Sequence, residues 1–220
     1  MEKLLQGILE FRKNLTEDKR ALFAELALEQ KPDTLFVACS DSRVVPNLFA
    51  STNPGDLFVL RNIGNLIPPF ESCLDVSAPA VLEFSVLQLK VEHIVICGHS
   101  ECGAMQRLAL RQGSMGSLGE CPHLTAWLMY GEEVVERIRK GVVLDPSLSE
   151  YNQLSQINVL LQLEHVLSYP FIRERVEKRE LHLHGWWFDI GRAQVHCFDP
   201  EFNSFVPIDE SQAQRMMARL

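Results

Sequence analysis

Residues 35–43 read LFVACSDSR, and this stretch decides the fold and points to the chemistry. Its first five residues form a continuous apolar run, which is typical of a β-strand buried on both faces of a sheet. Similar runs recur at residues 57–60 and 93–98, and a predicted helix at residues 79–90 lies between them, with Pro79 in its first turn. Buried strands that alternate with helices predict a mainly parallel sheet with right-handed crossovers.

The rest of the chain extends this α/β pattern. Helices are predicted at residues 103–111, 123–140 and 150–168, and two strands, 181–189 and 193–199, form a hairpin that adds an antiparallel edge to the sheet. Residues 3–29 carry apolar side chains at helical spacing and need a surface to cover. We therefore expect one domain over residues 1–220, with helices flanking the sheet and residues 1–30 as an N-terminal helical arm.

The composition excludes several classes of protein. The chain has 21 Lys and Arg against 29 Asp and Glu, a net charge of −8, and it contains no basic block, which argues against nucleic acid or an anionic membrane as a partner. It has no apolar run of the roughly 18 residues that a spanning helix needs, and its start does not resemble a signal peptide. We expect a cytoplasmic protein, in which the six cysteines are core residues, metal ligands or a nucleophile.

Two of the predicted buried strands end in residues that bind metals. The first ends at Cys39, and the third continues as GHSECG at residues 98–103, which supplies His99 and Cys102. Ligands of open parallel sheets bind outside the carboxyl ends of the strands, so these three side chains are expected to meet. Two thiolates and one imidazole suit zinc, and three protein ligands leave a fourth position for water, as in catalytic sites.

Asp41 and Arg43 follow the first predicted ligand, and they leave two arrangements open. Asp41 either binds the metal and closes the fourth position, or pairs with Arg43 and stays ionised beside a metal-bound water. Zinc lowers the pKa of such a water from about 15.7 to about 7, so the second arrangement makes a nucleophile at neutral pH. A competing metal site is His182 and His184, two residues apart on one strand face, with His196 on the partner strand. It lacks a nearby carboxylate, and we expect these histidines to be structural.

The metal-binding segments resemble those of the β-class carbonic anhydrases, zinc enzymes that hydrate carbon dioxide reversibly, and most of all the bacterial and cyanobacterial branch. The match extends over about residues 20–200 and is carried by ACSDSR at 38–43, GDLFVLRN at 55–62, CGHSECG at 97–103 and LHGW at 183–186. Cys-x-Asp-x-Arg followed by His-x-x-Cys is highly specific for this family. The resemblance implies a lyase that holds one zinc per chain and assembles as a dimer or a dimer of dimers, with the N-terminal helices packing on the partner.

The same resemblance implies a role for individual residues. It makes Cys39, His99 and Cys102 the permanent zinc ligands, and Asp41 and Arg43 a catalytic dyad in which Asp41 binds zinc only in closed forms. Substrate binding is expected from five further positions, of which Gln30 acts across a dimer interface with the amide of Gly103, and the other three form an apolar wall: Gln30, Phe58, Ile63, Phe84 and Gly103.

Three departures from the family pattern bear on the substrate pocket and on regulation. The loop at residues 71–79 lacks the family's usual glycines, and Phe84 replaces a tyrosine. Closed forms hold bicarbonate with a tryptophan, a tyrosine and an arginine, and the corresponding residues here are Phe36, Phe188 and Arg61. Because phenylalanine offers no polar hydrogen, we expect an open site in which Asp41 stays paired with Arg43.

The leading hypothesis is therefore hydration of carbon dioxide to bicarbonate and a proton. Two alternatives remain open at this stage. One is hydrolysis of carbonyl sulfide or carbon disulfide by the same zinc hydroxide, and the other is a non-catalytic zinc protein that senses bicarbonate. A role in carbon utilisation is expected for the enzyme, although the pathway does not follow from the sequence.

Overall fold

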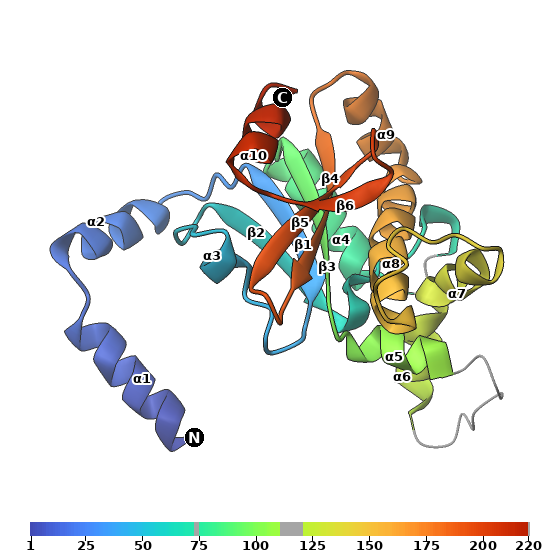
Figure 1. Ribbon diagram of the computed structural model, residues 1–220. Helices are drawn as coiled ribbons and strands as arrows, with labels where there is room; N and C mark the ends of the chain where they lie inside the picture. Colours follow the sequence, from blue (N-terminus) through green and yellow to red (C-terminus); the bar gives the residue numbers. More distant parts are fainter. Residues whose placement is uncertain (73–74, 111–120, 220) are drawn as a thin grey trace.

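The strands of the protein form one six-stranded mixed sheet with the order β2-β1-β3-β4-β5-β6 (Figure 1). The computed structural model describes residues 1–72, 75–110 and 121–219. Neighbouring strands are parallel from β2 to β4, whereas β4, β5 and β6 pair antiparallel. The strands are β1 (Thr34–Cys39), β2 (Leu57–Asn62), β3 (His93–His99), β4 (His182–Asp189), β5 (Gln194–Asp199) and β6 (Ser204–Pro207).

The helices lie between and around these strands. They are α1 (Glu2–Lys13), α2 (Glu17–Leu26), α3 (Pro46–Phe49), η1 (Ile63–Asn65), η2 (Phe70–Ser72), α4 (Ser77–Glu83), η3 (Phe84–Gln88), α5 (Gly103–Leu110), α6 (Pro122–Leu128), η5 (Met129–Gly131), α7 (Glu132–Arg139), α8 (Glu150–Leu167), α9 (Pro170–Glu177) and α10 (Glu210–Met217). None of these helices is long and apolar enough to cross a membrane, within the part of the chain that the structure describes.

Alternate residues of the central strands pack against opposite faces of the sheet. Leu35 and Val37 of β1 join a core with α4, α8 and α9, whereas Phe36 and Ala38 join a second core with α3 and the end of β4. Strands β1 and β3 are buried on both faces, as their apolar runs predict. Strand β2 lies at one edge of the sheet, so Val59 is 38% exposed and the prediction of a fully buried second strand is wrong.

The predicted hairpin and antiparallel edge are confirmed by the pairing of β4 with β5. Among the strands and the helices of eight or more residues that the structure describes, β6, α9 and α10 were not predicted. Pro170 explains the helix α9, because proline disfavours helical conformation in the residue before it and suits the first position of a new helix. The expected helix at 123–140 is interrupted by η5. Glycine and serine residues at 112–119 predict a loop, but this segment, like residues 73–74, lies outside the described residues.

The N-terminal helices α1 and α2 project away from the sheet (Figure 1). Neither helix has a buried residue, although α1 exposes a row of large apolar side chains: Leu4, Leu5, Ile8, Leu9 and Phe11. An amphipathic helix is normally stabilised by burying such a face. The arm therefore presents an apolar surface that the body of the same chain does not cover.

Candidate metal centre and active site

The carboxyl end of the sheet brings together the three predicted ligands. Cys39 is the last residue of β1, His99 is the last residue of β3, and Cys102 lies in the turn before α5. Their ligand atoms all lie within 4.8 Å of one another, and all three side chains are buried. Strands β1 and β3 are adjacent and in parallel register, so their carboxyl ends meet.

His99 is held in the tautomer that a metal needs. Its Nδ1 lies 2.8 Å from the carbonyl oxygen of Ser100, so Nδ1–H donates and Nε2 carries the free lone pair. Among the described residues, Nε2 of His99 has no hydrogen-bond partner, although the side chain is 0% exposed. A buried nitrogen left unpaired beside two sulfurs is explained by a metal ion that binds all three.

The two cysteines differ in how they hold their protons. The pKa of Cys39 is lowered, chiefly by the neighbouring thiol of Cys102 and, against the effect of burial, by the nearby His99 ring and the backbone N–H of Gly64. The pKa of Cys102 is raised, because it donates the hydrogen bond to Cys39 and is buried. The pair thus shares one proton, and binding a metal through both sulfurs would release it.

Asp41 and Arg43 form a bidentate ion pair beside this centre. Nε of Arg43 donates to Oδ1 of Asp41 at 2.9 Å, and Nη2 donates to Oδ2 at 2.7 Å. The guanidinium holds the pKa of Asp41 well below its usual value, and the backbone N–H of Arg43 adds to this effect. Arg43 also donates to the carbonyl oxygen of Glu101 at 3.0 Å, which ties the dyad to the turn between His99 and Cys102.

Arg61 fixes the backbone of Cys39 and Asp41. It donates from Nε to the carbonyl oxygen of Cys39 at 3.0 Å and from Nη2 to that of Asp41 at 2.6 Å. The aromatic rings of Phe36 and Phe188 both pack against Phe49, with centroid separations of 6.0 and 4.7 Å. Phe36 and Phe188, two of the three residues at the positions that hold bicarbonate in closed forms of the family, thus belong to an apolar cluster.

The five predicted substrate-binding residues divide into two groups. Ile63 and Gly103 lie next to the ligands, since Gly64 donates from its backbone N–H to Sγ of Cys39 at 3.4 Å and Gly103 follows Cys102. Gln30 precedes β1 and is exposed. A strand of six residues spans roughly 17 Å, so Gln30 lies at the opposite end of β1 from Cys39 of its own chain.

Phe58 and Phe84 belong with Gln30 to the second group, which lies away from the metal centre. Their rings stack at a centroid separation of 5.7 Å, and Phe58 pairs in register with Leu35 near the amino end of β1. The carboxyl end of β2 is four residues, or about 13 Å, further along. The structure therefore does not bring Gln30, Phe58 and Phe84 to the metal centre of the same chain.

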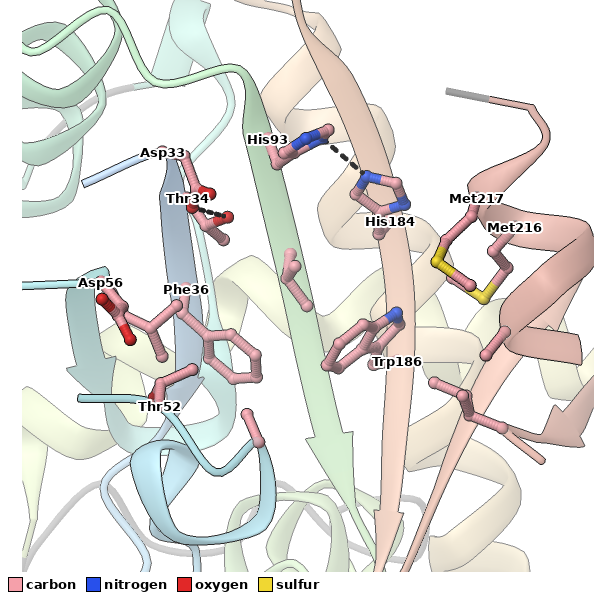
Figure 2. Close-up of a pocket in the computed structure, with 15 residues that line it drawn as sticks. Asp33, Thr34, Phe36, Thr52, Asp56, His93, His184, Trp186, Met216 and Met217 are labelled. Atoms are coloured by element: carbon pink, nitrogen blue, oxygen red, sulfur yellow. Dashed lines mark hydrogen bonds between the residues drawn. The ribbon is translucent and has the colours of Figure 1, made fainter. Parts of the chain in front are cut away.

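The alternative histidine site forms a different kind of cluster at the amino end of the sheet. Figure 2 shows His184 facing His93, which the sequence analysis did not include, with 3.3 Å between Nε2 and Nδ1. His196 instead packs its ring against Trp187. The pocket at this cluster has a volume of about 470 Å³ and is lined by Phe36, Trp186, Met216 and Met217 among others. Among the described residues, the group of possible metal ligands whose atoms lie within 4.8 Å of one another contains none of these histidines.

Sequence reasoning missed the polar side chains of α8 that contact the ligand segments. Asn152, Ser155 and Asn158 are buried and donate or accept hydrogen bonds at Glu101, His99 and Gly64. A signal was present, because polar residues three positions apart interrupt an otherwise apolar helix and point to partners on one face.

The fold and the site together define a zinc-dependent enzyme of the α/β class, with its metal centre at the carboxyl end of a parallel sheet. A family model described as carbonic anhydrase matches residues 34–195. A carbonic anhydrase of Helicobacter pylori is 37% identical over 218 residues and covers 98% of both chains, and one of Synechocystis is 36% identical over 94% of this chain and 74% of its own. The solved β-carbonic anhydrase CcaA superposes with a TM-score of 0.84 at 32% identity, covering 96% of this chain and 92% of that one.

The chain belongs to the β class of the carbonic anhydrases. It is a lyase that catalyses the reversible hydration of carbon dioxide to bicarbonate and a proton, and zinc is its metal. Neither of the two alternative functions finds support in these relatives. The resemblance noted from the sequence is thereby confirmed.

Proposed function

We propose that this carbonic anhydrase works with Cys39, His99 and Cys102 as its zinc ligands and with Asp41 and Arg43 as its catalytic dyad. The observation that carries the assignment is the unpaired, fully buried Nε2 of His99 beside two cysteine sulfurs. When bound, zinc supplies Lewis-acid chemistry that makes water a competent nucleophile near neutral pH. One zinc per chain follows from one such ligand group.

Asp41 orients the attacking water and does not take up its proton, which passes to the buffer. Arg43 engages both carboxylate oxygens, so the carboxylate stays ionised and its remaining lone pairs point in fixed directions. A hydrogen bond from the water to Asp41 turns a lone pair of the water oxygen toward the carbon atom of carbon dioxide. Because its pKa lies well below its usual value, Asp41 keeps this role at any pH near neutrality.

The substrate site is completed by a second copy of the chain. Ile63 and the backbone amide of Gly103 serve the metal centre of their own chain, whereas Gln30, Phe58 and Phe84 serve that of the partner. This division is supported by the separation of the second group from Cys39 along β1 and β2. Gln30 would bind a substrate oxygen, and the phenylalanines would supply the apolar wall against which carbon dioxide lies.

Self-association fits the relatives, since a solved β-carbonic anhydrase of Sordaria macrospora, which matches this chain at 32% identity and a TM-score of 0.69, is one of two described as tetrameric. We infer a homodimer or homotetramer in which the arm of residues 1–30 packs on the partner, and in which residues 1–220 form one catalytic unit. The uncovered apolar side chains of α1 support this role for the arm. The cytoplasmic location and the role in carbon utilisation stay predictions.

One experiment tests the assignment. Stopped-flow hydration of carbon dioxide would be measured on the purified enzyme together with its zinc content and its zinc X-ray absorption spectrum. We expect activity, one zinc per chain and two sulfur neighbours. A zinc shell of nitrogen and oxygen alone would overturn the ligand assignment and direct attention to His93 and His184.

A further inference from the structure

Helix α8 carries a row of polar side chains on a face that is packed inside the protein. Asn152, Ser155, Asn158 and Gln162 are spaced by three or four residues, so they lie along one side of the helix, and none is more than 9% exposed. We call these four residues the α8 polar stripe. Polar groups in the interior are costly unless they are hydrogen-bonded, so their partners show what the stripe does.

Asn158 holds the peptide that contacts the first ligand. Its Nδ2 donates to the carbonyl oxygen of Gly64 at 3.0 Å, and the N–H of Gly64 donates to Sγ of Cys39 at 3.4 Å. Gly64 has a φ of +78°, and a Cβ there would lie 3.0 Å from Cβ of Ala104, so no other residue suits this position. Asn158 thus acts on the Cys39 sulfur through a single residue.

Asn152 and Ser155 hold the segment with the other two ligands. Oγ of Ser155 donates to the carbonyl oxygen of His99 at 2.7 Å. Oδ1 of Asn152 accepts from the N–H of Glu101 at 2.8 Å, and its Nδ2 donates to the Glu101 carboxylate at 3.2 Å. Glu101 has a φ of +58°, an uncommon conformation for a residue other than glycine, and these bonds stabilise it.

The close packing of α8 on β3 makes these contacts short and rigid. A Cβ on Gly98 would lie 2.8 Å from Cγ2 of Val159 and 3.1 Å from the carbonyl oxygen of Ser155. Only glycine lets the helix approach the strand this closely, one residue before His99. The helix therefore lies against the metal centre without supplying a ligand.

We propose that the α8 polar stripe is a template that sets the zinc ligands in place before the metal binds, with Asn152, Ser155 and Asn158 as positioning residues. Each of the three holds a backbone group in a segment that bears or contacts a ligand, whereas Gln162 holds Ile67 and Asn158 instead. The proposal rests on the ligand assignment above. Since Glu101 also accepts from Arg43, Asn152 couples the template to the catalytic dyad.

The test compares zinc release from variants of the holoenzyme. Asn152→Leu and Asn158→Leu keep the branched shape of the side chain and remove the hydrogen bonds. Gln156→Met is the matched control, because Gln156 is 3% exposed on the same helix and its Oε1 has no partner among the described residues. Release to a chromogenic chelator would be timed, and the unfolding midpoint would be measured at saturating zinc. Loss of a hydrogen bond that orients a metal ligand weakens metal affinity by about 10–100-fold. We therefore expect zinc release to be faster by that factor in the two stripe variants and unchanged in the control.

The outcomes separate the template from the ligand assignment. If the stripe variants release zinc at the wild-type rate, the template is wrong although the ligand assignment stands. The same conclusion follows if the release rate rises only in proportion to the loss of stability and rises equally in Gln156→Met. A wild type without sulfur-bound zinc overturns both. Should the leucine variants fail to fold, Ser155→Ala removes a single oxygen and decides the matter by the same two measurements.

Discussion

Strand β3 begins at His93 and ends at His99, and the two histidines have opposite surroundings. His99 has one nitrogen anchored on a carbonyl oxygen and the other left unpaired beside two sulfurs. His93 directs its Nδ1 at His184, a neutral imidazole, next to methionine and tryptophan side chains. A histidine is suited to bind a metal where the fold anchors one ring nitrogen and leaves the other free beside thiolate donors. Histidines that face each other instead satisfy each other's hydrogen-bonding groups.

The largest effect is expected from removing one sulfur at the His99 end. Cys39→Ser or Cys102→Ser leaves zinc with a poor oxygen donor in place of a thiolate, so we expect the purified variant to lose its zinc and to be less stable. His93→Gln is the matched change at the other end of the strand and should keep one zinc per chain. Elemental analysis of all three variants measures this, and a zinc-free His93→Gln would contradict the contrast between the two ends.

Arg43→Ala is expected to separate metal binding from turnover. Without the guanidinium, Asp41 is free to turn onto the zinc and displace water, so the zinc content should stay near wild type while kcat falls by about 10²-fold or more. Stopped-flow hydration and a zinc count on the same sample measure both quantities. A hydration rate near wild type at neutral pH would show that the dyad has no role.

At the other end of the strand, the expected effect is on stability and depends on pH. Burial, together with positive charge on His93 and His182, lowers the pKa of His184 from 6.5 to about 4. The unfolded chain therefore binds a proton between pH 6.5 and 4 that the folded chain does not. The free energy of unfolding should fall as the pH falls through this window, by at most about 3 kcal/mol in total, and should not change from this cause above it.

The variant His184→Gln should reduce that slope. Denaturant unfolding at pH 7.5, 5.5 and 4.5 would compare it with the wild type, and the zinc content of both would be recorded at pH 7.5. Parallel stability curves for the two proteins would mean that His184 takes up its proton in the folded state as easily as in the unfolded chain.

The smallest expected effect is that of added bicarbonate, for which we predict no cooperative loss of activity. A bicarbonate ion beside Arg61 would meet Phe36 and Phe188, and each missing hydrogen-bond donor costs roughly 1–3 kcal/mol. The double variant Phe36→Trp with Phe188→Tyr supplies both donors and is the positive control. Sigmoidal inhibition of the wild type would contradict this prediction, and so would Asp41 bound to zinc in a crystal of the wild type at neutral pH.

The sequence predicted that Cys39, His99 and Cys102 would lie together, because this grouping depends on short-range features. Cys39, Asp41 and Arg43 lie within five residues, His99 and Cys102 lie within four, and one rule about strand ends brings the two segments together. The parallel strands and the hairpin were equally accessible, since apolar runs and turn residues are local signals.

Features that depend on the packing of distant segments were not accessible. The contact of His184 with His93 requires the register of β3 and β4, and the bond from Asn158 to Gly64 joins residues 94 apart. The edge position of β2 follows from the strand order, which alternation of strands and helices does not determine. No local pattern shows that Phe58 and Phe84 lie away from the metal centre of their own chain.

The distance between Gln30 and Cys39 within one chain has a consequence for how activity responds to dilution. If each centre borrows substrate-binding residues from a second chain, specific activity falls once the enzyme is diluted below the dissociation constant of the dimer, even though every chain keeps its zinc. Two inactive variants, one altered at Cys39 and one at Gln30, would regain part of the activity when unfolded and refolded together. In a dimer of one variant with the other, one centre carries both defects and the other centre carries neither. If equal amounts of the two variants pair at random, about a quarter of the wild-type activity is expected.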